Sequence, residues 1–203
     1  MNQKPSSPLP YSTLGGLFGH YLRRLIHLSC LVGLTVLFYQ FSPTWATWSG
    51  LRVSSLLAVI FVLVVAVECL RLRCGWLFIA QREHERHQPS SAAMSLIGLC
   101  VVGWVAPSAA YAYMIVATAA LIDPLIGELK RHAVSHVYLL ALLGAWLIWI
   151  GGAVCFIGVS WWLVALVPPV TVLVEKPCWR YLDDNFLMLA VPAAMVWCWV
   201  VLF

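Results

Sequence analysis

Three carboxylic acids lie close to the ends of long apolar segments, where a charged side chain is costly. Glu68, Asp123 and Glu175 each sit within or directly after a run of aliphatic and aromatic residues. Placing a carboxylate in a bilayer costs roughly 2.5–3.5 kcal/mol on insertion scales. Each acid therefore either pairs with a nearby base or contributes to a functional site.

Two of these acids have bases close by in the sequence. Glu68 precedes Arg71 by three residues, and Glu175 is followed by Lys176 and Arg180. Side chains three residues apart on a helix lie on the same face and can form an ion pair. Simple pairing and membership of a polar site both stay open for these two acids.

Asp123 is harder to explain by pairing, because Pro124 follows it directly. A proline at this position leaves the carbonyl of residue 120 without its helical donor and bends the end of the helix. Polar backbone of this kind is tolerated in a membrane where it is buried in protein or lines a cavity. We therefore expect Asp123 to belong to a polar site, with simple pairing as the less favoured alternative.

The triplet Asp183-Asp184-Asn185 stands just before the last apolar segment. One Asp or Asn is a favourable cap for the start of a helix, and acids suit its positive end. A cap uses only one such residue, and adjacent carboxylates repel each other unless a cation lies between them. Mg²⁺ is commonly held by one or two carboxylates together with substrate phosphates, so capping and Mg²⁺ binding are both open.

The most densely charged segment is Glu83-His84-Glu85-Arg86-His87. It lacks the HExxH spacing of zinc enzymes, since residue 88 is Gln. It is either a solvated loop or part of a phosphate or metal site. The same choice applies to Lys130-Arg131, which either sets membrane orientation or neutralises phosphates beside Asp123.

The composition indicates which elements must position these residues. Of 203 residues, 63% are apolar and 10% are charged, with a mean hydropathy of +0.91. Soluble domains carry about 25% charged residues. We expect an all-α, polytopic integral membrane bundle of about seven transmembrane helices. The net charge of +4 is small and needs no nucleic-acid partner.

The apolar runs define the expected organisation. Residues 1–20 are predicted to be a flexible N-terminal segment and residues 21–203 a single transmembrane domain. Residues 76–80 are expected at the membrane interface, and Pro168-Pro169 is expected to break the sixth span. The predicted spans are residues 25–41, 53–70, 92–106, 108–125, 137–159, 161–174 and 186–203.

The charge distribution predicts an orientation. With the N-terminus inside, eleven of the twelve Lys and Arg residues fall on the inner side, and only Arg52 falls outside. All eight acids and all six histidines also fall inside. Acids contribute little to orientation, so their clustering predicts one polar, active face on the cytoplasmic side.

Taken in order, these residues resemble the polyprenol kinase family, which includes dolichol and phytol kinases, and more distantly the phosphatidate cytidylyltransferases. The likeness covers about residues 20–192 and rests on five short segments near span ends. They are Arg23-Arg24-Leu-Ile-His27, Glu68 to Arg73, Arg82 to Arg86 with Ser90-Ser91-Ala92, Asp123-Pro124-Leu-Ile-Gly127, and Glu175 with Asp183-Asp184-Asn185.

The resemblance implies a CTP-dependent kinase that phosphorylates the hydroxyl of a membrane lipid alcohol such as a prenol, phytol, dolichol or diacylglycerol. It implies Mg²⁺ held by Asp123, Asp183 and Asp184, and a hydroxyl oriented or deprotonated by Glu85 or His84. Phosphates would be held by Arg86, Lys130 and Arg131, near Gly127 of the signature. Glu68, Glu175 and Asn185 would complete the polar face.

One departure from the family pattern concerns the nucleotide. The family has a glycine-rich segment after its signature, whereas this chain has no glycine between Gly127 and Gly144. The backbone cradle that such glycines offer a phosphate is missing. The donor is therefore CTP or another nucleoside triphosphate. A cytidylyltransferase-like enzyme and a catalytically lapsed or transport-type membrane protein are the alternatives.

Overall fold

The computed structural model describes residues 14–49, 53–175 and 183–203. Over these ranges the chain forms seven α-helices and one short 3-10 helix, with no strand, as the all-α prediction required. The helices are α1 (Gly16–Ser49), α2 (Val53–Cys74), η1 (Glu83–Arg86), α3 (Ser91–Val105), α4 (Ala109–Arg131), α5 (Val137–Cys155), α6 (Trp161–Val174) and α7 (Asp184–Leu202).

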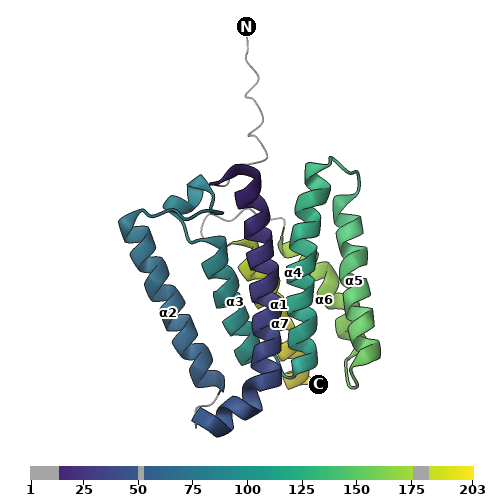
Figure 1. The fold of residues 1–203 in the computed structure, drawn as a ribbon. Coiled ribbons are helices and arrows are strands. Elements are labelled where there is room, and N and C mark those ends of the chain that lie inside the picture. Colours follow the sequence, from purple (N-terminus) through teal and green to yellow (C-terminus); the bar gives the residue numbers. More distant parts are fainter. Residues whose placement is uncertain (1–13, 50–52, 176–182) are drawn as a thin grey trace.

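The helices form a bundle in which α4 has the most central position (Figure 1). Helix α4 packs against α1, α5 and α7, while α3 packs against α7 and α1. Helix α2 lies at one edge against α3, and α5 and α6 form the opposite edge. The starts of α1, α3, α5 and α7 and the ends of α2, α4 and α6 share one end of the bundle, here called the polar end.

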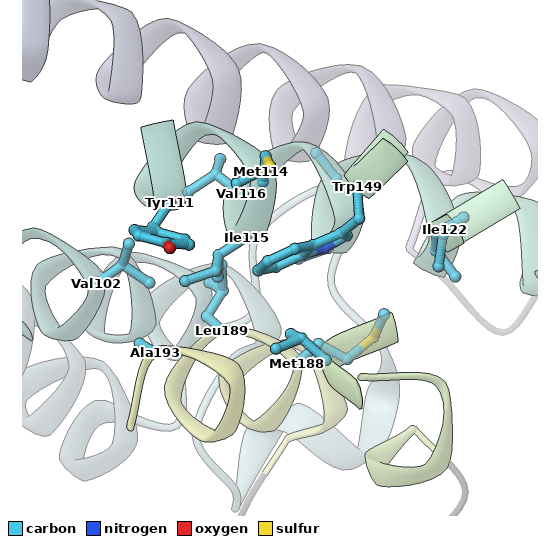
Figure 2. Close-up of a cluster of buried hydrophobic side chains, with 14 of the residues drawn as sticks. Val102, Tyr111, Met114, Ile115, Val116, Ile122, Trp149, Met188, Leu189 and Ala193 are labelled. Atoms are coloured by element: carbon cyan, nitrogen blue, oxygen red, sulfur yellow. The ribbon is translucent and has the colours of Figure 1, made fainter. Parts of the chain in front are cut away.

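The apolar core lies where α3, α4, α5 and α7 meet (Figure 2). Ile115, Trp149 and Met188 are buried there. The indole Nε1 of Trp149 donates a hydrogen bond to Thr118 Oγ1 at 3.0 Å, and Thr118 in turn donates to the Met114 carbonyl at 2.6 Å. The Trp149 indole and the Thr118 hydroxyl are thus satisfied by neighbours, as burial in an apolar medium requires.

Helix α6 corrects one expectation, since it runs through Pro168-Pro169 without a break. Pro169 has no N–H to donate to the carbonyl of Ala165, four residues earlier. That carbonyl accepts a hydrogen bond from the indole Nε1 of Trp146 on α5 at 3.4 Å. A neighbouring helix therefore supplies a donor to the carbonyl that Pro169 leaves without one.

Helices α1 and α4 extend furthest beyond their predicted bounds. Helix α1 begins at Gly16, so residues 16–20 are helical although they were expected in the flexible segment; residues 1–13 lie outside the described ranges. Helix α4 continues through Pro124 to Arg131. Its last turn carries Glu128 and Lys130, whose side chains pair with other helices. A prediction based on apolar runs could not include this last turn of α4, because the turn is polar.

Among the described residues, four helices are long and apolar enough to cross a membrane: residues 54–74 of α2, and α4, α5 and α7. Helices α3 and α6 are apolar but shorter. Large apolar side chains such as Val62, Leu147 and Leu202 face outward from the bundle. An outer surface of this kind suits lipid rather than water, so the chain is a membrane protein.

Candidate functional site

A polar cavity of about 90 Å³ opens at the polar end of the bundle. Helices α1, α3, α4 and α7 and the segment before η1 all contribute to it. Its lining mixes cationic groups with oxygen atoms, a combination that suits a ligand with phosphates and a divalent cation. The lining residues are His20, Arg23, Arg24, Arg82, Ser91, Asp123, Pro124, Gly127, Asp184 and Asn185.

Two arginines of α1 are fixed beside this polar cavity by acids from other elements. Arg23 donates to Glu85 of η1 at 2.5 Å, and Arg24 donates to Glu128 of α4. Glu85 and Glu128 are not themselves lining residues, so each acid holds its arginine from outside the cavity. The arrangement fixes two guanidinium groups in positions where they can bind an anion.

Gly127 allows Arg24 to lie close against α4. A Cβ at this position would come within 2.8 Å of the Arg24 Nη2 atom. Any larger residue would move the guanidinium from its place at the polar cavity. The glycine of the predicted signature therefore has a steric role towards an arginine.

The oxygen atoms of the polar cavity come from α4 and the start of α7. Asp123 and Asp184 line it, and they lie within electrostatic reach of each other and of Asp183. Asn185 is 6% exposed, and its amide nitrogen donates to Ser91 Oγ and Asp183 Oδ1, each at 2.6 Å. Its Oδ1 atom is buried without a partner among the described residues.

Asp183 is the cap of α7. Its Oδ1 atom accepts from the backbone N–H of Asn185 at 2.9 Å and from Ser91 Oγ at 3.4 Å. Of the three aspartates predicted to bind Mg²⁺, Asp123 and Asp184 line the polar cavity and Asp183 supports its wall. Within the triplet, Asp183 therefore caps α7, whereas Asp184 and Asn185 line the polar cavity.

The donor set fits Mg²⁺ in part. Within the described residues no group of three or more His, Cys, Asp or Glu side chains is arranged to hold a metal. Asp123, Asp184 and the unsatisfied Asn185 Oδ1 are hard oxygen ligands, which Mg²⁺ prefers, and it usually completes its shell with water and phosphate oxygens. These three residues would hold the ion, which would offset the repulsion between the two carboxylates.

A larger, mainly apolar cavity of about 260 Å³ adjoins the polar one. It shares Arg23 and Ser91 with the polar cavity and adds Glu85, which is 3% exposed. The side chain of His84, the other predicted hydroxyl partner, lies outside the described part of the structure. Glu85 is thus the predicted base that the structure places beside an apolar space.

The predicted phosphate ligands lie elsewhere. Arg86 is exposed and pairs with Glu83 at 3.5 Å, while Arg131 lies 3.6 Å from Glu128. Lys130 donates to Glu175 at 2.8 Å, and its Nζ is 5.2 Å from the centre of the Tyr138 ring. None of these three bases is a lining residue of the polar cavity.

The two remaining acids take part in structural pairs. Glu68 accepts from Arg71 at 3.0 and 2.8 Å, as the three-residue spacing predicted. Glu175 pairs with Lys130 of α4, whereas the bases suggested by the sequence, Lys176 and Arg180, lie outside the described residues. Glu68 and Glu175 thus brace the polar end without lining the polar cavity.

His20, Arg23, Arg24 and Arg82 line the polar cavity, yet the residue patterns assigned them no site role. Burial and the nearby Arg24 guanidinium lower the pKa of His20 below its usual 6.5, and Glu128 partly opposes them. His20 is therefore mainly neutral at pH 7 and adds no cation. The sequence signals for this group were the opening basic segment, which contains Arg23 and Arg24, and the segment from Arg82 to Arg86; His20 lay in neither.

Comparison of the chain with protein-family models, with curated proteins and with solved structures finds no match.

Proposed function

We propose that this chain is a lipid-alcohol kinase that transfers the γ-phosphoryl group of a nucleoside triphosphate to the hydroxyl of a membrane lipid. The proposal includes seven membrane crossings, an N-terminus on the inner side and an active face towards the cytoplasm, where nucleotide is present. It also carries membership of the polyprenol kinase group, on the motif likeness described above.

The observation that carries the proposal is the polar cavity at the end of an apolar bundle. Arginines from α1 and the η1 segment face oxygen ligands from α4 and α7 across a single space. Phosphoryl transfer depends mainly on positioning and on neutralising charge on the transferred group. A site that offers both guanidinium groups and hard oxygen ligands supplies these two needs.

The chain's own residues divide the work. Arg23, Arg24 and Arg82 hold phosphate oxygens, and Asp123, Asp184 and Asn185 hold the divalent cation. A bound Mg²⁺ would offset charge on the phosphates. The lipid oxygen bonds to the γ-phosphorus, the bond from that phosphorus to the bridging oxygen breaks, and the nucleoside diphosphate leaves. The hydroxyl proton passes to the Glu85 carboxylate and then to solvent.

The donor follows from how the phosphates are held. In this chain α4 remains helical to Arg131, over the stretch where the family has its glycine-rich segment. The arginines at the polar cavity take the place of a backbone cradle. Guanidinium groups bind the phosphates and do not contact the nucleobase. We therefore expect CTP and ATP to compete for the same site.

The test is a transfer assay on the purified chain in nanodiscs. It supplies γ-labelled CTP or ATP, Mg²⁺ and a panel of prenols, phytol, dolichol and diacylglycerol. We expect label in the lipid fraction, with a loss of about a hundredfold or more in Asp184→Asn, as is usual for removing a group that stabilises transferring charge. Glu83→Gln is the matched control, since Glu83 is exposed and only pairs with Arg86.

Two results would overturn the proposal. Absence of label both in lipid and in released pyrophosphate, with every donor and alcohol, would favour a lapsed or transport-type protein. Lipid labelled from the α-phosphate of CTP, with release of pyrophosphate, would identify a cytidylyltransferase. Equal activity in Asp184→Asn and wild type would remove the assigned site even if the kinase activity were real.

A further inference from the structure

We infer that the apolar cavity between α1, the segment before η1 and α3 binds the tail of the lipid alcohol, with the hydroxyl held at Glu85 and Arg23. This inference rests on the proposed function and adds the path and position of the lipid. The lining residues are Arg23, Ile26, Leu31, Phe78, Ile79, Ala80, Gln81, Glu85, Ser91, Ala92, Ser95 and Leu96.

The charged and the aliphatic lining residues of this apolar cavity suit the two ends of an amphiphilic ligand. Ile26, Leu31 and Leu96 offer aliphatic surface, whereas Glu85 is the only acid and Arg23 the only Lys or Arg among the lining residues that the structure describes. A ligand with one polar end and a long apolar tail can satisfy both parts. A fully polar ligand would leave the aliphatic wall against charged groups, which is unfavourable.

The apolar cavity leads from the outer surface of the bundle to the phosphate site. Ile26 and Ile79 at its wall are 44% and 62% exposed, so a lipid tail can reach it from the side of the bundle. At the other end Arg23 and Ser91 belong to both cavities. A hydroxyl at this junction would face the phosphates held in the polar cavity.

A second apolar space, the α1/α4 groove, also borders the polar cavity but suits the alcohol less well. It measures about 530 Å³ and shares Arg24 and Pro124 with the polar cavity. Arg24 is the only charged residue in the described part of its lining, and a guanidinium donates hydrogen bonds and cannot accept a proton. The reacting hydroxyl needs an acceptor for its proton, and Glu85 supplies one only in the first cavity.

The experiment is photolabelling of the full-length chain in nanodiscs with a prenyl alcohol that carries a diazirine on its tail, followed by peptide mapping. Labelling is competed with the unmodified alcohol or with its methyl ether, which cannot donate a proton. Two tryptophan variants at exposed helix positions are compared: Ala92→Trp fills the apolar cavity, and Leu121→Trp fills the α1/α4 groove.

We expect label on the peptides that contain Ile26 and Leu96, with competition by the alcohol and not by the ether. Labelling should fall about tenfold in Ala92→Trp, which corresponds to about 1.4 kcal/mol. It should be unchanged in Leu121→Trp. The wild-type map stands even if one variant folds poorly, and melting temperatures of both variants check their folding.

The other outcomes separate the inference from the proposed function. Label confined to the peptide containing Leu121, or label that the alcohol does not compete, would overturn the inference while leaving a kinase in place. Competed label at Leu96 without phosphoryl transfer from any donor would support the lipid site and overturn the kinase. Equal competition by the ether would show that the hydroxyl is not recognised and would overturn the assigned head position.

Discussion

Arg71 is the most completely satisfied charged residue that the structure describes. It is 2% exposed, and its guanidinium makes five hydrogen bonds: two to Glu68 and one each to the carbonyls of Trp76, Glu85 and Gln88. A guanidinium has five N–H donors, so every donor is used. One side chain therefore connects the end of α2 to the chain before η1 at Trp76, to η1 itself at Glu85 and to the chain after it at Gln88.

We predict that Arg71→Met destabilises the protein strongly. The substitution leaves the Glu68 carboxylate without its cation and three carbonyls without a donor, and breaking a buried pair in this way costs about 3–5 kcal/mol. Arg73→Met is the matched control, because Arg73 is two residues away and exposed; a change within about 0.5 kcal/mol is expected. Thermal unfolding in one detergent measures both, and equal melting temperatures would contradict the assigned role.

At this scale the sequence revealed local pairs and missed distant ones. Glu68 and Arg71 are three residues apart on one helix, and the geometry of a helix is enough to join them. Lys130 and Glu175 are 45 residues apart, and Arg24 and Glu128 are 104 apart. Only the packing of whole helices decides such pairs, so the sequence could not assign arginines of α1 to the polar cavity.

At the scale of elements, helices α3 and α7 pack closely at Gly98. A Cβ at this position would lie 2.9 Å from Leu189 Cδ1 and 3.1 Å from Leu189 Cβ. Leu189 is fully buried, so it has little room to move. Close approach over a small residue is a common way for membrane helices to gain packing contacts.

We predict that Gly98→Ala forces α3 and α7 apart and lowers stability by about 1–3 kcal/mol, as overpacking usually does. The change should also lower transfer activity, since Ser91 and Asp184 line the polar cavity from these two helices. Gly151→Ala is the control, because a Cβ there meets no atom within 4 Å. Unfolding in detergent would show the difference, and a Gly98→Ala variant as stable as Gly151→Ala would refute the close packing.

The sequence predicted the helices better than their ends. Apolar runs located all seven helices because apolarity and length are what a membrane helix requires. Their ends were less accurate: α1 runs from Gly16 to Ser49, where residues 25–41 were predicted. Helix α6 differs from the prediction because the Trp146 indole satisfies a carbonyl that Pro169 cannot. Helix α4 differs because its last polar turn is held by partners from α1 and by Glu175. Both effects depend on a neighbouring helix, which a local pattern does not contain.

Over the whole molecule, polar groups concentrate at one end of the bundle. The polar cavity, the Arg71 hydrogen bonds and the Lys130–Glu175 pair all lie at the polar end. The sequence predicted this clustering from its charges, and the membrane class from its composition. It could not predict which acids line a cavity and which only brace it, because that depends on side-chain direction.

The proposed orientation gives a prediction for two cysteines. Cys74 ends α2 at the polar end of the bundle, and Cys155 ends α5 at the opposite end; both are exposed and free. In single-cysteine variants in intact cells, we expect a membrane-impermeant maleimide to label Cys155. Cys74 should react only after permeabilisation. The reverse pattern would show that the polar end faces outward, away from cytoplasmic nucleotide.

The hydrogen bonds between Ser91 and the start of α7 have a consequence for biogenesis. Ser91 is 92 residues from Asp183 and 94 from Asn185, so these contacts form only after α7 has been synthesised. Nascent chains still held at the ribosome would have the arginines of α1 and the acid of α4 but no closed site. Under the proposed function, unfinished protein would be unable to consume nucleotide until the last described helix docks.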